Sequence, residues 1–245
     1  MSVHGAAFYD DDVLFAAYTA HRQDRDNPPD ALEKPVMLDL IGDVVGLRIL
    51  DLGCGAAAFG RMTLEQGCRA YVGVEGSRNM VELAKQTLAS STGEIIHATI
   101  EAWDYPTAAF DLVVSRLALH YIEDFAAVCE KIYQTLAHSG RFIFSVEHPV
   151  VTSCAQSWQS VGSRQDWIVD TYFTSGPRNT VWLGGEVVRY HRTVEEYFGS
   201  LQRAGFVVER LRESCPRPEQ FADEATYERY RRIPLFLFLA ARKGT

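Results

Sequence analysis

The chain has 245 residues, of which 47% are hydrophobic, as expected for one globular domain. Its formal charge of −8 disfavours a general nucleic-acid or membrane-surface binder, and no apolar run approaches the ~20 residues that cross a bilayer. Five cysteines without a C-x-x-C pair, and an N-terminus without a signal-peptide pattern, predict a cytoplasmic protein with neither disulfides nor a metal site.

The N-terminal part predicts two helices. Apolar residues recur at helical spacing over residues 8–21 and again over residues 31–45, and Asn27-Pro28-Pro29 separates the two stretches. We therefore expect residues 1–46 to form a helical cap on the domain that follows.

From residue 48 the sequence alternates between strand and helix patterns. The expected strands are 48–52, 70–74, 94–97, 110–115 and 141–146, and the expected helices are 57–65, 79–89 and 125–137. Such alternation is typical of a parallel sheet with helices on both faces.

The alternation is interrupted over residues 150–190, which contain three of the four tryptophans and no clean helical period. We interpret this stretch as an inserted lid or a small β-rich excursion over the sheet edge. A helix over 193–203 follows, because Thr193 and Glu196 have the spacing of a capping box.

The last two predicted strands, 206–211 and 235–240, are joined by a link without a full helix pattern, which favours an antiparallel pair. The expected fold is α/β: one domain with a Rossmann-like, doubly wound, seven-stranded, mostly parallel sheet. Its last strand is antiparallel, and N-terminal helices and an inserted lid complete it.

A glycine-rich turn follows the first predicted strand, in the stretch R-I-L-D-L-G-C-G-A-A-A-F-G from residue 48. It fits the dinucleotide fingerprint G-x-G-x-x-G/A, and Glu75 supplies the acid about 20 residues later. Asp51, however, would repel a pyrophosphate and would suit an amino group or a sulfonium cation. The turn alone leaves both ligands open.

The later landmarks carry a resemblance. Asp51, Gly53 and Gly55, with Ala57 in place of a third glycine, resemble motif I of the class I S-adenosylmethionine-dependent methyltransferases. The stretches that match this family in order are Val72–Ser77 with Met80, Ile100-Glu101, Phe110–Ser115 and Leu119-His120-Tyr121. Later stretches resemble a bacterial, methyltransferase type 11-like branch without a firmly assigned acceptor.

The resemblance implies S-adenosylmethionine as cofactor, with Glu75 on the ribose hydroxyls, Ile100 and Glu101 beside the adenine, and residues 18 and 22 near the methionine end. The cofactor-binding residues that it implies are Tyr18, Arg22, Asp51, Gly53, Cys54, Gly55, Glu75, Gly76, Ser77, Met80, Ile100, Glu101 and Ser115. We interpret Cys54 as a small residue that fills the turn and not as a nucleophile.

An acceptor with a proton to lose needs a base, and His or Glu serves near neutral pH. The candidates, all expected at the carboxyl edge of the sheet, are His120, Glu147, His148 and His191. Arg116 or Arg192 could bind an acceptor carboxylate or phosphate.

We expect a methyltransferase with a small-molecule acceptor, acting as a monomer or homodimer. The alternatives are an NAD(P)-binding oxidoreductase, a methyltransferase of RNA or protein, and a fold kept for interaction only.

Overall fold

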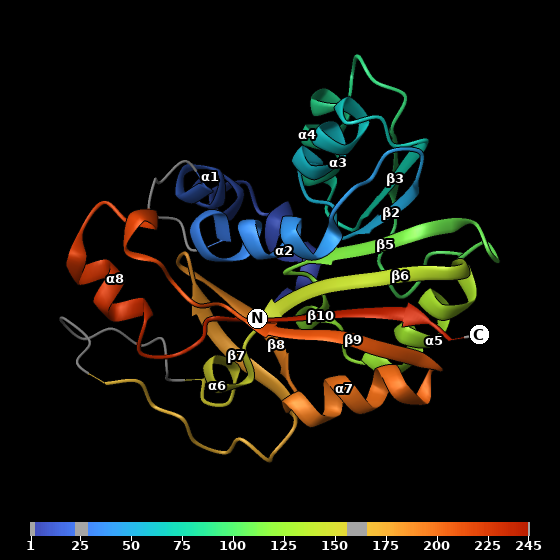
Figure 1. Cartoon of the computed structure of the whole chain (residues 1–245). Coiled ribbons are helices and arrows are strands. Elements are labelled where there is room, and N and C mark those ends of the chain that lie inside the picture. The colour runs from blue at the N-terminus through green and yellow to red at the C-terminus, as the bar shows by residue number, and fades with distance from the viewer. Residues whose placement is uncertain (1–2, 23–28, 156–165, 245) are drawn as a thin grey trace.

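The computed structural model describes residues 3–22, 29–155 and 166–244. Its main sheet has seven strands: β2 (Arg48–Leu52), β3 (Ala70–Glu75), β4 (Glu94–His97), β5 (Phe110–Arg116), β6 (Leu136–Glu147), β9 (Phe206–Glu213) and β10 (Phe236–Lys243). Their spatial order is β4-β3-β2-β5-β6-β10-β9 (Figure 1). The first five are parallel, and β10 is antiparallel to both its neighbours. The predicted fold class is confirmed.

Successive residues of the strands pack into two separate cores, one on each face of the sheet. Leu50 and Val113 belong to the core beneath α5 (Phe125–Thr135) and α7 (Val194–Arg203). Their neighbours Ile49 and Leu112 belong to the opposite core, which is covered by α2 (Lys34–Ile41), α3 (Ala58–Glu65) and α4 (Arg78–Thr87). A sheet buried on both faces explains the nearly continuous apolar runs of its strands.

A second, three-stranded sheet contains β1 (Val3–His4), β8 (Gly185–His191) and β7 (Gly176–Trp182), in the order β1-β8-β7. The β-rich alternative for residues 150–190 is therefore right where the structure describes them, and a short helix, α6 (Pro149–Thr152), precedes it. Trp158 lies outside the described residues, as do Asn27 and Pro28. Because β1 pairs with β8 in parallel, the N-terminus is joined to the insertion.

The helical cap differs from the prediction. A 3-10 helix over Gly5–Asp10 precedes α1 (Asp12–Arg22), so the expected helix at 8–21 begins four residues late. The late start is explained by the residue before α1. Asp11 Oδ1 accepts hydrogen bonds from the backbone N–H groups of Val13 and Leu14, at 2.9 and 3.0 Å, and so stabilises the first turn of the helix. The second helix also begins late, at Lys34, after a π-helical turn over Pro29–Glu33.

Two further details lie in the C-terminal half. The capping box at Thr193 and Glu196 is present, as predicted. The link between β9 and β10 contains a 3-10 turn (Pro218–Gln220) and a seven-residue helix, α8 (Glu224–Tyr230), where no full helix was expected; Asp223 caps this helix. Among the described helices, none is both long enough and apolar enough to span a membrane.

Candidate functional site

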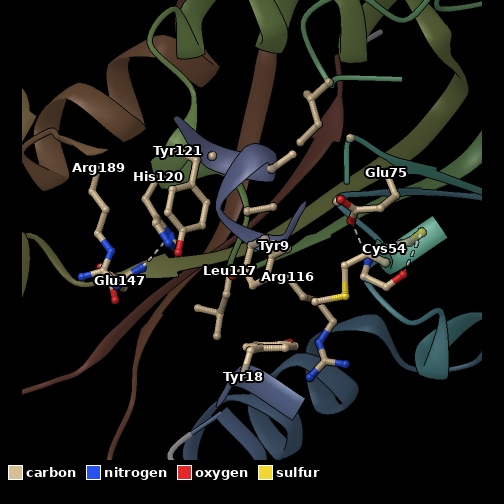
Figure 2. Close-up of a pocket in the computed structure, with 18 of the residues that line it drawn as sticks. Tyr9, Tyr18, Cys54, Glu75, Arg116, Leu117, His120, Tyr121, Glu147 and Arg189 are labelled. Atoms are coloured by element: carbon tan, nitrogen blue, oxygen red, sulfur yellow. Dashed lines mark hydrogen bonds and ion pairs between the residues drawn. The ribbon is translucent and has the colours of Figure 1, made fainter. Parts of the chain in front are cut away.

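One cavity of about 1310 Å³ lies at the carboxyl edge of the parallel strands (Figure 2). Its wall comes from the turns after β2 and β3, the segment after β5, the end of β6, the 3-10 helix and α1 of the N-terminal segment, and strands β7 and β8. Single-ligand pockets usually measure about 300–1,000 Å³. The cavity therefore has room for two small molecules side by side.

The glycine turn shapes one end of the cavity. Gly53 has a φ of 72°, and a Cβ there would lie 2.4 Å from the Cβ of Ala118, so position 53 requires glycine for both conformation and space. Gly55 has a φ of 54°, but a Cβ there would meet nothing within 4 Å and would project into open space. Ala57, where a third glycine was expected, is itself left-handed with a φ of 55° and occupies the N-cap position of α3 without a capping hydrogen bond from its side chain.

Beneath this turn lies a buried pair of polar groups. The Tyr71 hydroxyl donates to Asp51 Oδ2 at 2.7 Å, and burial raises the pKa of Asp51 to about 6. Burial also raises the pKa of the Cys54 thiol far above its usual value, so this thiol stays protonated at neutral pH and is a poor nucleophile.

Glu75 ends β3 with its carboxylate at the cavity and only 7% of its surface exposed. Oε2 accepts from the Gly55 N–H and Oε1 from the Ser77 N–H, both at 2.9 Å. Burial raises the pKa of Glu75, and these hydrogen bonds oppose the shift. The carboxylate is thus held firmly between two backbone segments, with oxygen lone pairs left for a ligand.

Most of the other residues expected to bind cofactor also line the cavity: Tyr18, Arg22, Asp51, Gly53, Cys54, Gly55, Gly76, Met80, Ile100 and Glu101. Two do not. Ser77 is fully buried, where it caps α4 and donates to Asp10 Oδ1 at 2.8 Å. Ser115 Oγ donates to the Leu52 carbonyl at 2.8 Å and so joins β5 to β2.

Of the four candidate bases, two line the cavity and two do not. His120 and Glu147 line the cavity (Figure 2), whereas His148 and His191 are not part of its wall. His148 accepts from the Val150 N–H and contacts Glu213 at 2.9 Å. The two ring nitrogens of His191 contact Thr152 and the Tyr172 carbonyl, both at 2.8 Å. Each of these two rings joins distant parts of the chain outside the cavity wall.

His120 lines the cavity as a neutral ring. Burial, with Arg189 and Arg192 nearby, lowers its pKa well below the usual value, so the ring is neutral at pH 7. Its Nδ1 accepts the Glu147 backbone N–H at 3.4 Å. Because a neutral imidazole carries one proton, that proton is then on Nε2.

The structure adds two arginine–glutamate pairs to the cavity wall that the sequence did not reveal. Arg116, after β5, binds Glu33, and Arg189, in β8, lies 3.2 Å from Glu147. Nothing in the local pattern around Glu33 or Arg189 indicates a site, because their partners lie 83 and 42 positions away in the chain. Arg192 instead donates to the backbone carbonyls of Ile122 and Glu123.

Comparisons with known proteins agree with this geometry. Residues 50–144 match the family model of a methyltransferase domain. The chain is 31% identical to an uncharacterized protein of Haemophilus influenzae, over 96% of both. It is 34% identical to an S-adenosylmethionine-dependent methyltransferase of Mesorhizobium loti, with a TM-score of 0.79 and coverage of 91% of this chain and 100% of that one.

A solved structure from Listeria monocytogenes, assigned to the same class of enzyme, is 35% identical with a TM-score of 0.80 and covers 87% of this chain and 97% of its own. Identity at this level over nearly the whole of two such structures, on a sheet with the strand order described above, means that this chain belongs to the class I S-adenosylmethionine-dependent methyltransferases.

Proposed function

We propose that the chain transfers a methyl group to a small molecule bound beside S-adenosylmethionine in the same cavity. The observation that carries this proposal is the volume of about 1310 Å³, shared between the glycine turn at one end and a cluster of buried polar groups at the other. The cluster contains His120, Glu147 and Arg189.

The residues at the glycine turn fit the cofactor. A Cβ at Gly55 would occupy the open space that a ligand needs, and the Glu75 carboxylate faces that space with two oxygens, which suits two vicinal hydroxyls. Ile100 and Glu101 would lie beside the adenine, and Tyr18 and Arg22 near the methionine end. When bound, S-adenosylmethionine supplies a methyl group on a cationic sulfur.

The charges of the cavity favour an uncharged or cationic acceptor. The acidic residues in its wall are Asp10, Glu33, Asp51, Glu75, Glu101, Glu123 and Glu147, against the arginines Arg22, Arg116 and Arg189. Each of the three arginines already lies against a carboxylate. An acceptor carboxylate or phosphate would therefore compete with these carboxylates, which argues against the expectation that Arg116 binds one.

Glu147 is the group that we propose as proton acceptor. Its side chain ends β6 in the cavity wall, and burial raises its pKa, which brings its basicity closer to neutral pH. The acceptor's proton would pass to Glu147, and the electron pair left on the acceptor atom would form the new bond to the methyl carbon. The sulfur–methyl bond would break at the same time, with its electron pair staying on sulfur to give neutral S-adenosylhomocysteine. His120, with its proton on Nε2, would orient the acceptor as a hydrogen-bond donor.

The inserted sheet would act as the lid on the acceptor side of a single domain, because β8 supplies Arg189 to the wall. Membership of the methyltransferase family argues against an NAD(P)-binding oxidoreductase. The net charge of −8 disfavours an RNA acceptor. The five scattered cysteines, none of them in a C-x-x-C pair, support a reducing cytoplasm.

A labelling experiment tests the proposal. The full chain and deuteromethyl S-adenosylmethionine are incubated with one fraction of a bacterial extract at a time. The three fractions are small molecules, protein and RNA. Mass spectrometry is expected to find label in the small-molecule fraction, and less of it with Glu147→Gln. Label confined to protein or RNA would refute the small-molecule acceptor.

A further inference from the structure

The two buried arginine–glutamate pairs of the cavity differ in how completely their hydrogen bonds are made. Arg116 engages both oxygens of Glu33, through Nε to Oε1 at 3.1 Å and through Nη2 to Oε2, and Ser145 Oγ donates to Oε1 at 2.7 Å. This pair is bidentate, with a hydrogen bond to each carboxylate oxygen of Glu33, as in a structural ion pair. It joins the N-terminal segment to the ends of β5 and β6.

The second pair is close, but the two facing atoms do not form a hydrogen bond. Arg189 Nε lies 3.2 Å from Glu147 Oε2, and the side chains are 6% and 15% exposed. Both atoms are shielded from solvent, yet neither has a hydrogen bond of acceptable geometry to any described residue. The attraction is therefore Coulombic and not directional, so it favours the charged form of Glu147 without committing its lone pairs to a linear bond.

Arg189 is held in place by aromatic groups. Its guanidinium carbon lies 5.8 Å from the ring centre of Trp182, and Trp182 stacks on Phe8 of the N-terminal segment at 5.3 Å. A guanidinium fixed in this way presents a constant charge to Glu147. The fixed charge comes from the inserted sheet and the proton acceptor from the main sheet.

From these contacts we infer that Arg189 is a positioning residue, which keeps Glu147 ionised and ready to accept the acceptor's proton. The inference rests on the proposed function of Glu147. It assigns the inserted sheet a part in catalysis, because without β8 the carboxylate would be buried with no cation beside it.

The other groups that face Glu147 are uncharged near neutral pH. His120 and Tyr121 come from the 3-10 helix Leu119–Tyr121, and Tyr197 comes from α7. Burial lowers the pKa of His120 and raises the pKa values of both tyrosines. Among the described residues, Arg189 is the one charged group that lowers the pKa of Glu147.

Titration of Glu147 by NMR tests the inference without knowledge of the acceptor. The full chain carries carboxyl-labelled glutamate and bound S-adenosylhomocysteine, and Glu147→Gln identifies the resonance. Arg189→Met is expected to move the Glu147 midpoint upward by about 1–3 pH units, the usual effect of one adjacent opposite charge. Arg189→Lys keeps the charge and should remain closer to wild type. Arg116→Met is the matched control, because it breaks the other pair and should leave the midpoint in place.

An unchanged midpoint in Arg189→Met would overturn the inference. If that variant does not fold, the Arg189 Nε resonance of the wild type, identified with Arg189→Lys, serves instead: it should follow the Glu147 midpoint, and independence from it would equally overturn the inference. Failure of the proposed function looks different. Glu147→Gln would then methylate as fast as wild type, whatever the titration shows.

Discussion

The Tyr71 hydroxyl donates to Asp51 Oδ2 across 2.7 Å, directly beneath the glycine turn. Asp51 belongs to β2 and Tyr71 to the adjacent β3, and both are at most 2% exposed. Gly60 of α3 provides the room, since a Cβ there would lie 2.3 Å from Tyr71 Cζ. Three adjacent elements thus fix one carboxyl group at the floor of the cavity.

This burial predicts a specific pH dependence of stability. Because the folded pKa of Asp51 is about 6 and its ordinary value is 3.8, its contribution to stability is fully present below about pH 4 and is lost as pH rises through about 6. A shift of about two units corresponds to roughly 3 kcal/mol. Relative to wild type, Asp51→Asn should therefore gain about that much unfolding free energy between pH 4 and pH 7, as measured by urea denaturation.

Asp111 offers a control of opposite sign. The Arg48 guanidinium lowers the pKa of Asp111, so its contribution to stability is present at neutral pH and is lost on acidification. That loss falls below the ordinary pKa of 3.8, so the stability difference between wild type and Asp111→Asn should stay nearly constant from pH 4 to pH 7 and should shrink only on further acidification. Parallel stability curves for wild type and Asp51→Asn would show that Asp51 is not buried as described.

The two glycines of the turn should respond differently to alanine. At Gly53 a Cβ would meet the Cβ of Ala118 at 2.4 Å, so Gly53→Ala should unfold at markedly lower temperature. At Gly55 there is space, so Gly55→Ala should cost only about 1–2 kcal/mol of left-handed strain. Its methyl group would however enter the cofactor space, and calorimetry should show weaker binding of S-adenosylhomocysteine. Equal loss of stability in the two variants would contradict the described turn.

The sequence predicts the main sheet because each of its strands is decided locally. Runs such as residues 110–115 are apolar at four of six positions, and a strand buried on both faces has a nearly continuous apolar pattern wherever it occurs. The cofactor end is predictable for a related reason. Its residues lie in the turns that directly follow those strands, and the ends of parallel strands meet at one edge.

The polar cluster that we propose for the acceptor could not be predicted in this way. Arg189 reaches Glu147 only because the insertion folds back as a second sheet and pairs with the N-terminal strand. His148 and Ser77 show the opposite case: each is adjacent in sequence to a cavity residue, but its side chain contacts a distant residue outside that site, Glu213 for His148 and Asp10 for Ser77. The sequence predicts which residues lie at the end of a strand. The direction of their side chains depends on contacts with distant parts of the chain.

Glu75 and Ser77 make a matched pair for cofactor binding. Glu75→Ala removes the carboxylate that faces the cavity, and loss of two hydrogen bonds to a charged group should weaken binding of S-adenosylhomocysteine by about 100-fold. Ser77→Ala removes only a helix cap and the bond to Asp10, so it should cost about 1 kcal/mol of stability with little change in binding. Calorimetry and thermal denaturation of both variants measure the two effects. Similar affinity in the two variants would remove Glu75 from the cofactor site.

His120 should act as a hydrogen-bond donor and not as a base. Its ring is neutral, and its Nδ1 accepts the Glu147 N–H, so its one proton is on Nε2. Once an acceptor is identified, Glu147→Gln should abolish the acidic limb of the pH profile of kcat/KM, because that limb reports ionisation of Glu147. His120→Gln places an amide near the Nε2 position, so it should lower kcat/KM and keep the limb. Loss of the limb in His120→Gln, with its retention in Glu147→Gln, would assign the proton transfer to the histidine instead.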